Sequence, residues 1–176
     1  RGELAAILVE PVLASLGVVT PRPGYLKGVR ELATRYGVYL IFDEVQTGFF
    51  GSGKPWLWQV HGVAPDIVAF GKKTQVCGIY SSKRVDDVPG NVFHKASRIN
   101  STWGGNLVDM VRCAKYLEVI EKDRLVENAA AMGERLLAGL EDLASRHPMV
   151  SNVRGCGLFT AFTLPSAEVR DRLRQT

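Results

Sequence analysis

The chain has 176 residues, of which 46% are hydrophobic and 23% charged, a composition typical of a globular protein that buries one sizeable core. Its net charge of +4 comes from 22 basic residues scattered among 18 acidic ones without any basic run, which argues against a nucleic-acid partner. No apolar stretch approaches the ~20 residues of a membrane-spanning helix, and no signal or transit sequence is visible. We therefore expect a cytoplasmic protein with no membrane contact.

The ends and the cysteines give two further expectations. The first residue is Arg1 rather than Met, and a strand-like apolar run begins almost at once, so we expect a part of a longer protein. Cys77, Cys113 and Cys156 are odd in number and far apart. This pattern indicates reduced thiols rather than a disulfide framework or a zinc knuckle.

Three short apolar runs, at residues 5–9, 38–42 and 67–70, are continuous rather than alternating. Such runs are typical of strands buried on both faces of a parallel sheet. Between the first two, apolar residues at helical spacing predict a helix that Pro23 and Gly24 open and Gly37 ends. Strand, helix, strand is the crossover unit of an α/β sheet.

The rest of the chain predicts more helix and a second sheet. We expect a fourth strand within 76–84, a loop from 86 to 103, a long helix capped by Asn106, and a second helix that follows a bend near Asp123 and ends before Pro148. Strands at 150–153 and 158–164, on either side of a turn at 154–157, predict the start of a smaller domain. We divide the chain into part of a large domain, 1–120, and a linking helix with the start of a small C-terminal domain, 121–176.

Two polar side chains stand where the predicted strands end. Asp43 follows the run Leu40-Ile41-Phe42, and Lys72 comes two residues after the run that ends at Phe70. Open α/β sheets bind ligands at the carboxyl ends of their strands, where Glu10 also falls. An amine there can form a Schiff base with a carbonyl, and an acid can hold a protonated ring nitrogen, which are the requirements of pyridoxal 5′-phosphate chemistry.

Asp43 and Lys72, each taken alone, have a simpler interpretation. Asp43 could cap the next turn, and a lysine at a strand end is usually solvated. The combination of the two, with Gly71 allowing a bulky cofactor to approach the backbone, favours a built site. Lys73 stands next to Lys72, and only one of the two can point into that site.

A strand ending in Asp-Glu is also the Walker B pattern of ATPases. The matching phosphate loop would read G-x-x-x-x-G-K-[ST]. The nearest segment, Gly71-Lys72-Lys73-Thr74, has Lys73 at the hydroxyl position, and Asp66 stands where the first glycine belongs. The match fails at two places, so only a phosphate loop outside this sequence would support an ATPase.

The residues resemble the class-III pyridoxal-phosphate aminotransferases. The resemblance covers nearly the whole chain, and the matching stretches are Val9-Glu10-Pro11, Leu40-Ile41-Phe42-Asp43-Glu44-Val45-Gln46-Thr47-Gly48, Pro65-Asp66-Ile67-Val68-Ala69-Phe70-Gly71-Lys72 and Asn100-Ser101-Thr102-Trp103-Gly104-Gly105-Asn106. It implies fold type I, with a partial large domain and the start of the small C-terminal domain. Residues 66–164 are most similar to the lysine 6-aminotransferase branch, and residues 9–49 look more like the glutamate-1-semialdehyde aminomutase branch.

The resemblance also implies roles for single residues. Lys72 would hold the cofactor as an aldimine and move protons, Asp43 would pair with the pyridine nitrogen, Val45 would pack against the ring, and Gln46 would reach its phenolic oxygen. Thr102 would bind the cofactor phosphate of the neighbouring subunit, which implies a homodimer with shared active sites. The substrates would be a small amine donor, lysine or a similar ω-amino acid, and a keto acid acceptor, 2-oxoglutarate.

The chain departs from the family pattern at Ser15. Aminotransferases for ω-amino acids usually carry a glutamate there that masks an arginine, and a serine has no charge for that pairing.

In the family, the phosphate loop and the ring-stacking aromatic lie before Arg1, and the carboxylate-binding arginine lies beyond Thr176. We expect Arg154 to be structural. An aminomutase-like enzyme or a folded but inert fragment remain alternatives, and isolated His61, His94 and His147 predict no metal site.

Overall fold

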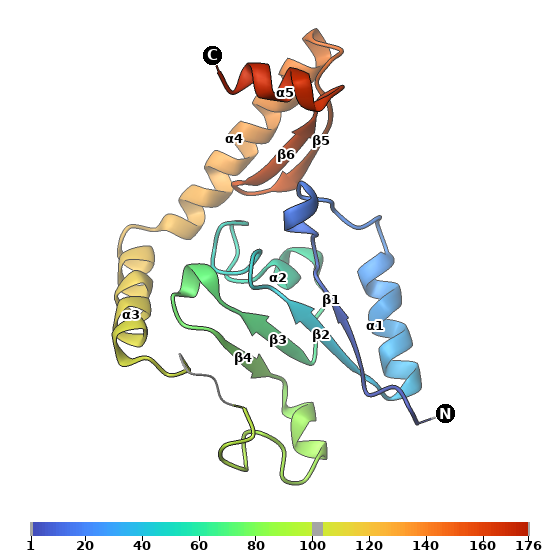
Figure 1. Cartoon of the computed structure of the whole chain (residues 1–176), viewed down its shortest axis with the longest axis vertical. Helices are drawn as coiled ribbons and strands as arrows, with labels where there is room; N and C mark the ends of the chain where they lie inside the picture. Colours follow the sequence, from blue (N-terminus) through green and yellow to red (C-terminus); the bar gives the residue numbers. More distant parts are fainter. Residues whose placement is uncertain (1, 100–103, 176) are drawn as a thin grey trace.

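The computed structural model describes residues 2–99 and 104–175. Along the chain the elements are β1 (Ala6–Val9), α1 (Tyr25–Tyr36), β2 (Tyr39–Asp43), α2 (Leu57–His61), β3 (Ile67–Phe70), β4 (Gly78–Ser81), α3 (Leu107–Lys122), α4 (Leu125–Arg146), β5 (Ser151–Cys156), β6 (Phe159–Thr163) and α5 (Ala167–Leu173), with short 3-10 turns at Ala14–Leu16, Lys72–Thr74 and Lys83–Asp87. Figure 1 shows a sheet flanked by helices, with α4 and the β5–β6 hairpin at the opposite end of the molecule from the N-terminus.

The main sheet has four strands in the order β1-β2-β3-β4, and the first three run parallel. β4 pairs antiparallel with β3. The strands predicted at 5–9, 38–42 and 67–70 are thus confirmed, and the α/β class is confirmed with them. Because β2 and β3 are parallel, their carboxyl ends lie at one edge of the sheet, where Asp43 pairs in register with Ala69.

The two faces of this sheet have different surroundings. Leu40 and Phe42 are fully buried in a cluster with Leu26 and Ala33 of α1. Successive side chains of a strand point to opposite faces, so Asp43 points away from this core. On that other face, Leu8 of β1 is 64% exposed.

A buried aspartate joins three segments around the start of β2. Asp66 accepts hydrogen bonds from Arg30 of α1 at 2.8 Å and from Arg84 of the 83–87 turn at 2.9 Å, and its carboxylate also accepts the N–H of Leu40 at 2.8 Å. Burial would raise the pKa of Asp66, but these donors outweigh burial and lower the pKa below its usual value of 3.8. Asp66 therefore fixes α1 against β2 and β3 as a charged group.

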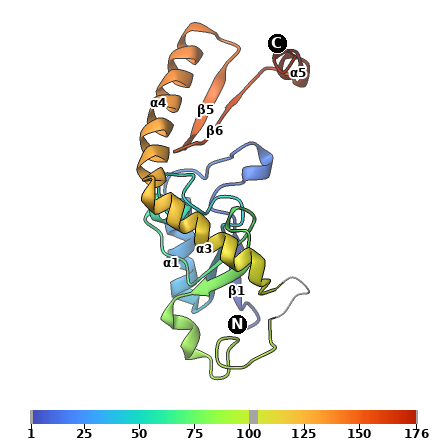
Figure 2. The same ribbon diagram turned by 90° about the vertical axis from the view of Figure 1, so that its left-hand side faces the viewer.

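The helices begin and end where the sequence predicts. Gly37 ends α1 in the left-handed conformation, and Asn106 accepts the N–H of Val108 at the start of α3. α3 and α4 meet at Asp123 and Arg124, and α4 ends before Pro148. Figure 2 shows α3 and α4 following one side of the molecule, with the β5–β6 hairpin beside α4.

Two expectations need correction. Arg154 was expected in a turn, but it lies within β5, which continues to Cys156. The strand continues because Gly155 has φ +124°, and a side chain there would start 2.1 Å from the carbonyl oxygen of Phe159. Helices α2 and α5 were not expected, since five and seven residues are too few to give a clear helical period.

We expect Asp66→Asn to lower the free energy of unfolding at pH 7 by about 3 kcal/mol, because it leaves two half-buried guanidinium groups without their carboxylate. The pKa of Asp66 is depressed in the folded chain, so its contribution is present above the unfolded value near 3.8 and is lost as the pH falls below it. The deficit of the variant should shrink on acidification from pH 7 to pH 3. Urea unfolding followed by circular dichroism measures it.

The matched control is Asp142→Asn, which breaks an exposed pair with Arg146 on α4. This variant should change the free energy of unfolding by less than about 0.5 kcal/mol. An equal loss in the two variants would contradict the special role of Asp66.

Candidate active site

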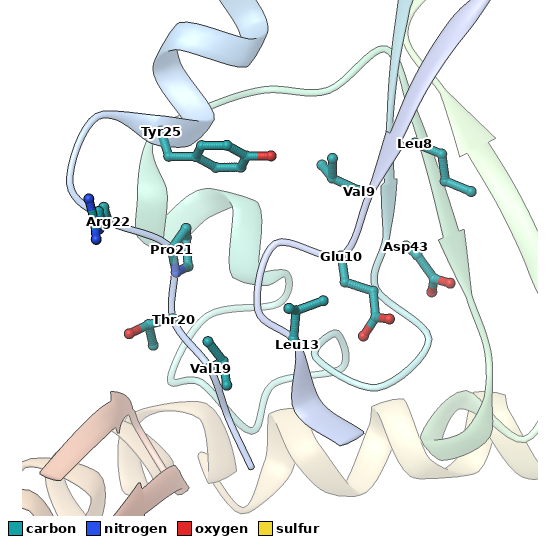
Figure 3. A pocket seen from close by; sticks show the side chains of 10 residues that line it. All are labelled: Leu8, Val9, Glu10, Leu13, Val19, Thr20, Pro21, Arg22, Tyr25 and Asp43. Atoms are coloured by element: carbon teal, nitrogen blue, oxygen red, sulfur yellow. The ribbon is translucent and has the colours of Figure 1, made fainter. Parts of the chain in front are cut away.

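A cavity of about 550 Å³ lies at the carboxyl ends of β1 and β2. Glu10 and Asp43 line it from the strands, and Tyr25 lines it from the first turn of α1. Figure 3 shows the two carboxylates on the strand side of the cavity and the Tyr25 ring across from them. Residues between Leu13 and Arg22 complete the wall. This edge of the sheet is the place where an open α/β fold binds ligands.

Asp43 is half-buried at the last position of β2. Its Oδ1 accepts the backbone N–H of Val45 at 3.0 Å, which is the turn-capping role that the sequence left open. The same carboxylate lines the cavity. Capping holds the acid in place and leaves it at the cavity wall, so the two predicted roles are compatible.

Lys72 begins the 3-10 turn that follows β3. Its side chain is exposed, and its backbone has φ +55°, a left-handed conformation that is uncommon for a residue with a side chain and costs about 1 kcal/mol or more. Asp43 pairs with Ala69, three residues before Lys72, so the acid and the lysine lie at one edge. Lys72 does not line the cavity beside Asp43.

The turns after β2 and β3 are packed against each other at Gly71. A Cβ atom built on Gly71 would lie 2.9 Å from Cys77 Sγ and 3.6 Å from Val45 Cγ1. The position needs a glycine because of Cys77, whereas the distance to Val45 is an ordinary van der Waals contact. Val45, one of the predicted cofactor residues, therefore lies beside the residue that precedes Lys72.

The side chain of Lys73 contacts a backbone carbonyl and an aromatic ring. Its Nζ donates to the backbone carbonyl of Gln46 at 2.7 Å and lies 5.9 Å from the centre of the Phe159 ring. Loss of hydration lowers the pKa of Lys73; the charge of Glu44 opposes this shift and that of Lys72 adds to it. Of the two adjacent lysines, Lys73 serves as a link between β6 and the turn after β2.

The side chain of Gln46 is held by Ser15. Gln46 Nε2 donates to Ser15 Oγ at 2.6 Å. The sequence singled out Ser15 only as a departure from the family pattern and did not predict this contact. Thirty-one positions separate the two residues, so no local spacing could have indicated it.

Glu44, the neighbour of Asp43, points into the protein and is 1% exposed. It accepts the backbone N–H groups of Leu57 at 2.7 Å and Trp58 at 2.8 Å, at the start of α2, and the hydroxyl of Thr47 at 3.3 Å. Burial raises the pKa of Glu44, and these donors offset part of the rise. The two acids of the Asp-Glu pair therefore have different roles, the first at the cavity and the second as a cap.

Arg154 of β5 contacts the loop that carries Ser15. Its guanidinium donates to the backbone carbonyls of Gly17 and Val18, with Nε 3.1 Å from each. These contacts agree with the structural role expected from the sequence.

Thr102, the predicted phosphate contact, lies outside the described residues. Within 2–99 and 104–175, no group of three or more His, Cys, Asp or Glu side chains could hold a metal ion. None of the helices in these ranges is long and apolar enough to span a bilayer.

Glu44→Ala should lower the free energy of unfolding by about 2–3 kcal/mol, because it leaves the buried N–H groups of Leu57 and Trp58 without acceptors. Glu44→Gln is the matched control, since its amide oxygen can still accept one of them and the loss should be smaller. Urea unfolding at pH 7 measures both. Equal stability of Glu44→Ala and the unsubstituted chain would contradict the capping role.

The raised pKa of Glu44 adds a pH dependence to this comparison. The folded chain keeps the proton at pH values where the unfolded chain has lost it, so the contribution of Glu44 declines as the pH rises above its usual pKa of 4.5. The advantage of the unsubstituted chain over Glu44→Gln should therefore fall between pH 4 and pH 7. An advantage that grows over this interval would exclude the raised pKa.

Comparison with known proteins places these features in a family. The model of the class-III aminotransferases matches residues 1–175. The L-lysine-epsilon aminotransferase of Mycobacterium tuberculosis is 49% identical over 172 residues, which are 97% of this chain and 38% of that protein. The corresponding enzyme of Amycolatopsis lactamdurans is 45% identical over 171 residues, again 97% and 38%. Because each relative aligns along nearly the whole chain, the two segments that resemble different branches align with one protein.

Solved structures of aminotransferases also superpose on this chain. The lysine aminotransferase of M. tuberculosis in its internal aldimine form superposes with a TM-score of 0.91 at 49% identity, covering 97% of this chain and 39% of that one. The taurine:2-oxoglutarate aminotransferase of Bifidobacterium kashiwanohense, in complex with pyridoxal phosphate and glutamate, gives 0.80 at 29% identity, covering 90% and 36%. The chain thus spans about two fifths of the length of these relatives, 38% of the curated ones. It belongs to the class-III aminotransferases, which are pyridoxal-phosphate enzymes of fold type I.

Proposed function

We propose that this chain is the cofactor-binding central part of an enzyme that removes the terminal amino group of L-lysine, or of a similar ω-amino acid, and transfers it to 2-oxoglutarate. The products would be a semialdehyde and glutamate. The observation that carries the proposal is the shared sheet edge, at which the β2–β3 register places Asp43 and the turn of Lys72 together. Identity of 49% to a lysine-epsilon aminotransferase supports the choice of amine donor.

The described residues fit pyridoxal 5′-phosphate. Asp43 presents a carboxylate at the cavity wall, which suits a protonated pyridine nitrogen. Val45 lies beside the buried Gly71, next to the turn of Lys72, and would offer an apolar side chain to one face of the ring. Gln46 would donate an amide N–H to the phenolic oxygen. When bound, the cofactor supplies an electron sink for the carbanion formed at the substrate carbon.

Lys72 has two tasks in this proposal. Its Nζ would hold the cofactor covalently at the carbonyl carbon, and, when an incoming amine takes its place there, the same Nζ would carry a proton to and from the substrate carbon. The turn that carries Lys72 is braced by the hydrogen bond from Gln75 N to its carbonyl at 2.9 Å. A fixed backbone with an exposed side chain suits an amine that must release the cofactor and later bind it again.

The remaining features of the reaction are proposals that follow from the family. The amine donor and keto acid would use one site in turn. Two copies of the protein would form a homodimer, with Thr102 of one copy binding the cofactor phosphate of the other, and the protein would act in the cytoplasm.

Mixing the chain with pyridoxal 5′-phosphate should give a visible absorption band. Lys72→Ala should abolish this band, because it removes the amine that binds the carbonyl carbon in this proposal. Lys73→Ala is the matched control and should retain the band, since Lys73 is committed to Gln46 and Phe159. Loss of the band in Lys73→Ala but not in Lys72→Ala would show that Lys73, and not Lys72, binds the cofactor covalently.

Asp43→Asn should weaken binding of the cofactor by on the order of tenfold or more, because an amide cannot form the charged pair with the ring nitrogen. Titration with pyridoxal 5′-phosphate, followed by its absorbance, gives the dissociation constant. Asp142→Asn changes an exposed acid on α4 in the same way, away from the turn of Lys72, and should leave the constant unchanged. Equal affinity in Asp43→Asn and the unsubstituted chain would remove Asp43 from the site.

The cofactor-loaded chain should lose its band on addition of L-lysine and regain it on addition of 2-oxoglutarate, as expected for two half-reactions at one site. A change with glutamate-1-semialdehyde but not with lysine would instead support an aminomutase-like enzyme. A band that responds to none of these compounds would identify an inert fragment.

A further inference from the structure

A continuous set of contacts runs from β5 to Gln46, and the proposed reaction does not use it. Arg154 holds the loop at Gly17 and Val18, this loop carries Ser15, and Ser15 holds the amide of Gln46. The set joins the C-terminal hairpin to a residue assigned to the cofactor.

The contact between Ser15 and Gln46 fixes how the amide is turned. A glutamine side chain has two N–H groups on Nε2, and one of them is taken by Ser15 Oγ at 2.6 Å. The other N–H then points in a direction set by the planar amide group. The backbone carbonyl of Gln46 also accepts from Lys73 at 2.7 Å, so the residue is held at both ends.

Ser15 itself is held firmly, although its side chain is exposed. It lies in the 3-10 turn Ala14–Leu16, at the tip of a small loop closed by two backbone hydrogen bonds between Leu13 and Val19, of 3.0 and 3.1 Å. Gly17 permits the tight reversal with φ +91°. The guanidinium of Arg154 then ties this tip to β5.

From this geometry we propose that Ser15 is a positioning residue: its hydroxyl orients the Gln46 amide so that the free N–H is aimed at the phenolic oxygen of the cofactor. The inference rests on the proposed function, since it assigns a task to Gln46 within the cofactor site. It gives the serine a function that does not depend on a charge pair.

Two measurable effects follow from losing the hydroxyl. In Ser15→Ala the amide of Gln46 is free to rotate, so the dissociation constant for pyridoxal 5′-phosphate should rise about fivefold. A donated N–H also stabilises the deprotonated phenolic oxygen. Its loss should move the midpoint of the pH-dependent absorbance of the bound cofactor up by about half a pH unit.

The experiment compares Ser15→Ala with two further variants. Ser15→Thr keeps a hydroxyl at the position and should restore both the affinity and the midpoint. Ser145→Ala removes an exposed hydroxyl that donates to the Asp142 carbonyl on α4, and it should change neither. Absorbance titrations with pyridoxal 5′-phosphate, and then with pH, give both quantities without any turnover.

The outcomes separate this inference from the proposed function. If the unsubstituted chain shows the band and Ser15→Ala matches it in affinity and midpoint, Ser15 does not position Gln46 for the cofactor. If the unsubstituted chain gives no band, the proposed function fails and the cofactor role of Ser15 fails with it. Even then, nuclear magnetic resonance of the Gln46 side-chain amide, without cofactor, tests the contact between Ser15 and Gln46. A change in the amide chemical shift in Ser15→Ala but not in Ser145→Ala supports this contact, and no change overturns it.

Discussion

The register between β2 and β3 is the constraint on which the candidate site depends. Asp43 pairs with Ala69, and the N–H of Glu44 donates to the Ala69 carbonyl at 2.9 Å, so the pairing continues one residue beyond the strand. Burial of Leu40 and Phe42 on the core face determines which residues of β2 point outward. A slip of one residue would turn Asp43 toward the core and Glu44 toward the cavity, and would separate the acid from the turn of Lys72. The hydrophobic core on one face therefore decides the chemistry on the other.

The turns after these strands act as one unit. Gly71 leaves room for Cys77 and lies beside Val45, Lys73 donates to Gln46, and Glu44 caps α2 from inside the protein. Each contact joins a residue of one turn to a different segment, so the left-handed backbone at Lys72 is held by its surroundings. Strained conformations persist where the surrounding structure over-determines them. Gln75, which ends the same turn, also has a positive φ, so the strain belongs to the turn as a whole and not to Lys72 alone.

The sequence predicted the features that depend on local pattern. Continuous apolar runs gave the parallel strands, and Gly37, Asn106 and Pro148 gave the helix ends, because strand burial and helix capping are written in neighbouring residues. The positions of Asp43 and Lys72 at strand ends followed directly. Features that depend on distant residues did not follow: Ser15 meets Gln46 across 31 positions, and β5 passes through Gly155 only because a glycine can lie against Phe159. The short α2 depends on Glu44 as its cap, a role that no local pattern indicated because the acid lies 13 positions before Leu57.

The C-terminal hairpin also bears on the site. Arg154 contacts the loop of Ser15, Phe159 lies near the Lys73 amine, and the N–H of Leu158 donates to the Gly51 carbonyl at 2.9 Å. All three contacts involve segments that follow β1, β2 or β3 at the carboxyl edge of the sheet. The large sheet fixes the positions of Asp43 and the turn of Lys72, whereas the contacts of Gln46 extend through Ser15 and Arg154 to the hairpin. The boundary predicted near residue 120 would therefore separate the two sheets but would cut across these contacts, since a displacement of the hairpin would reach Gln46 through Arg154 and Ser15 while leaving the β2–β3 register intact.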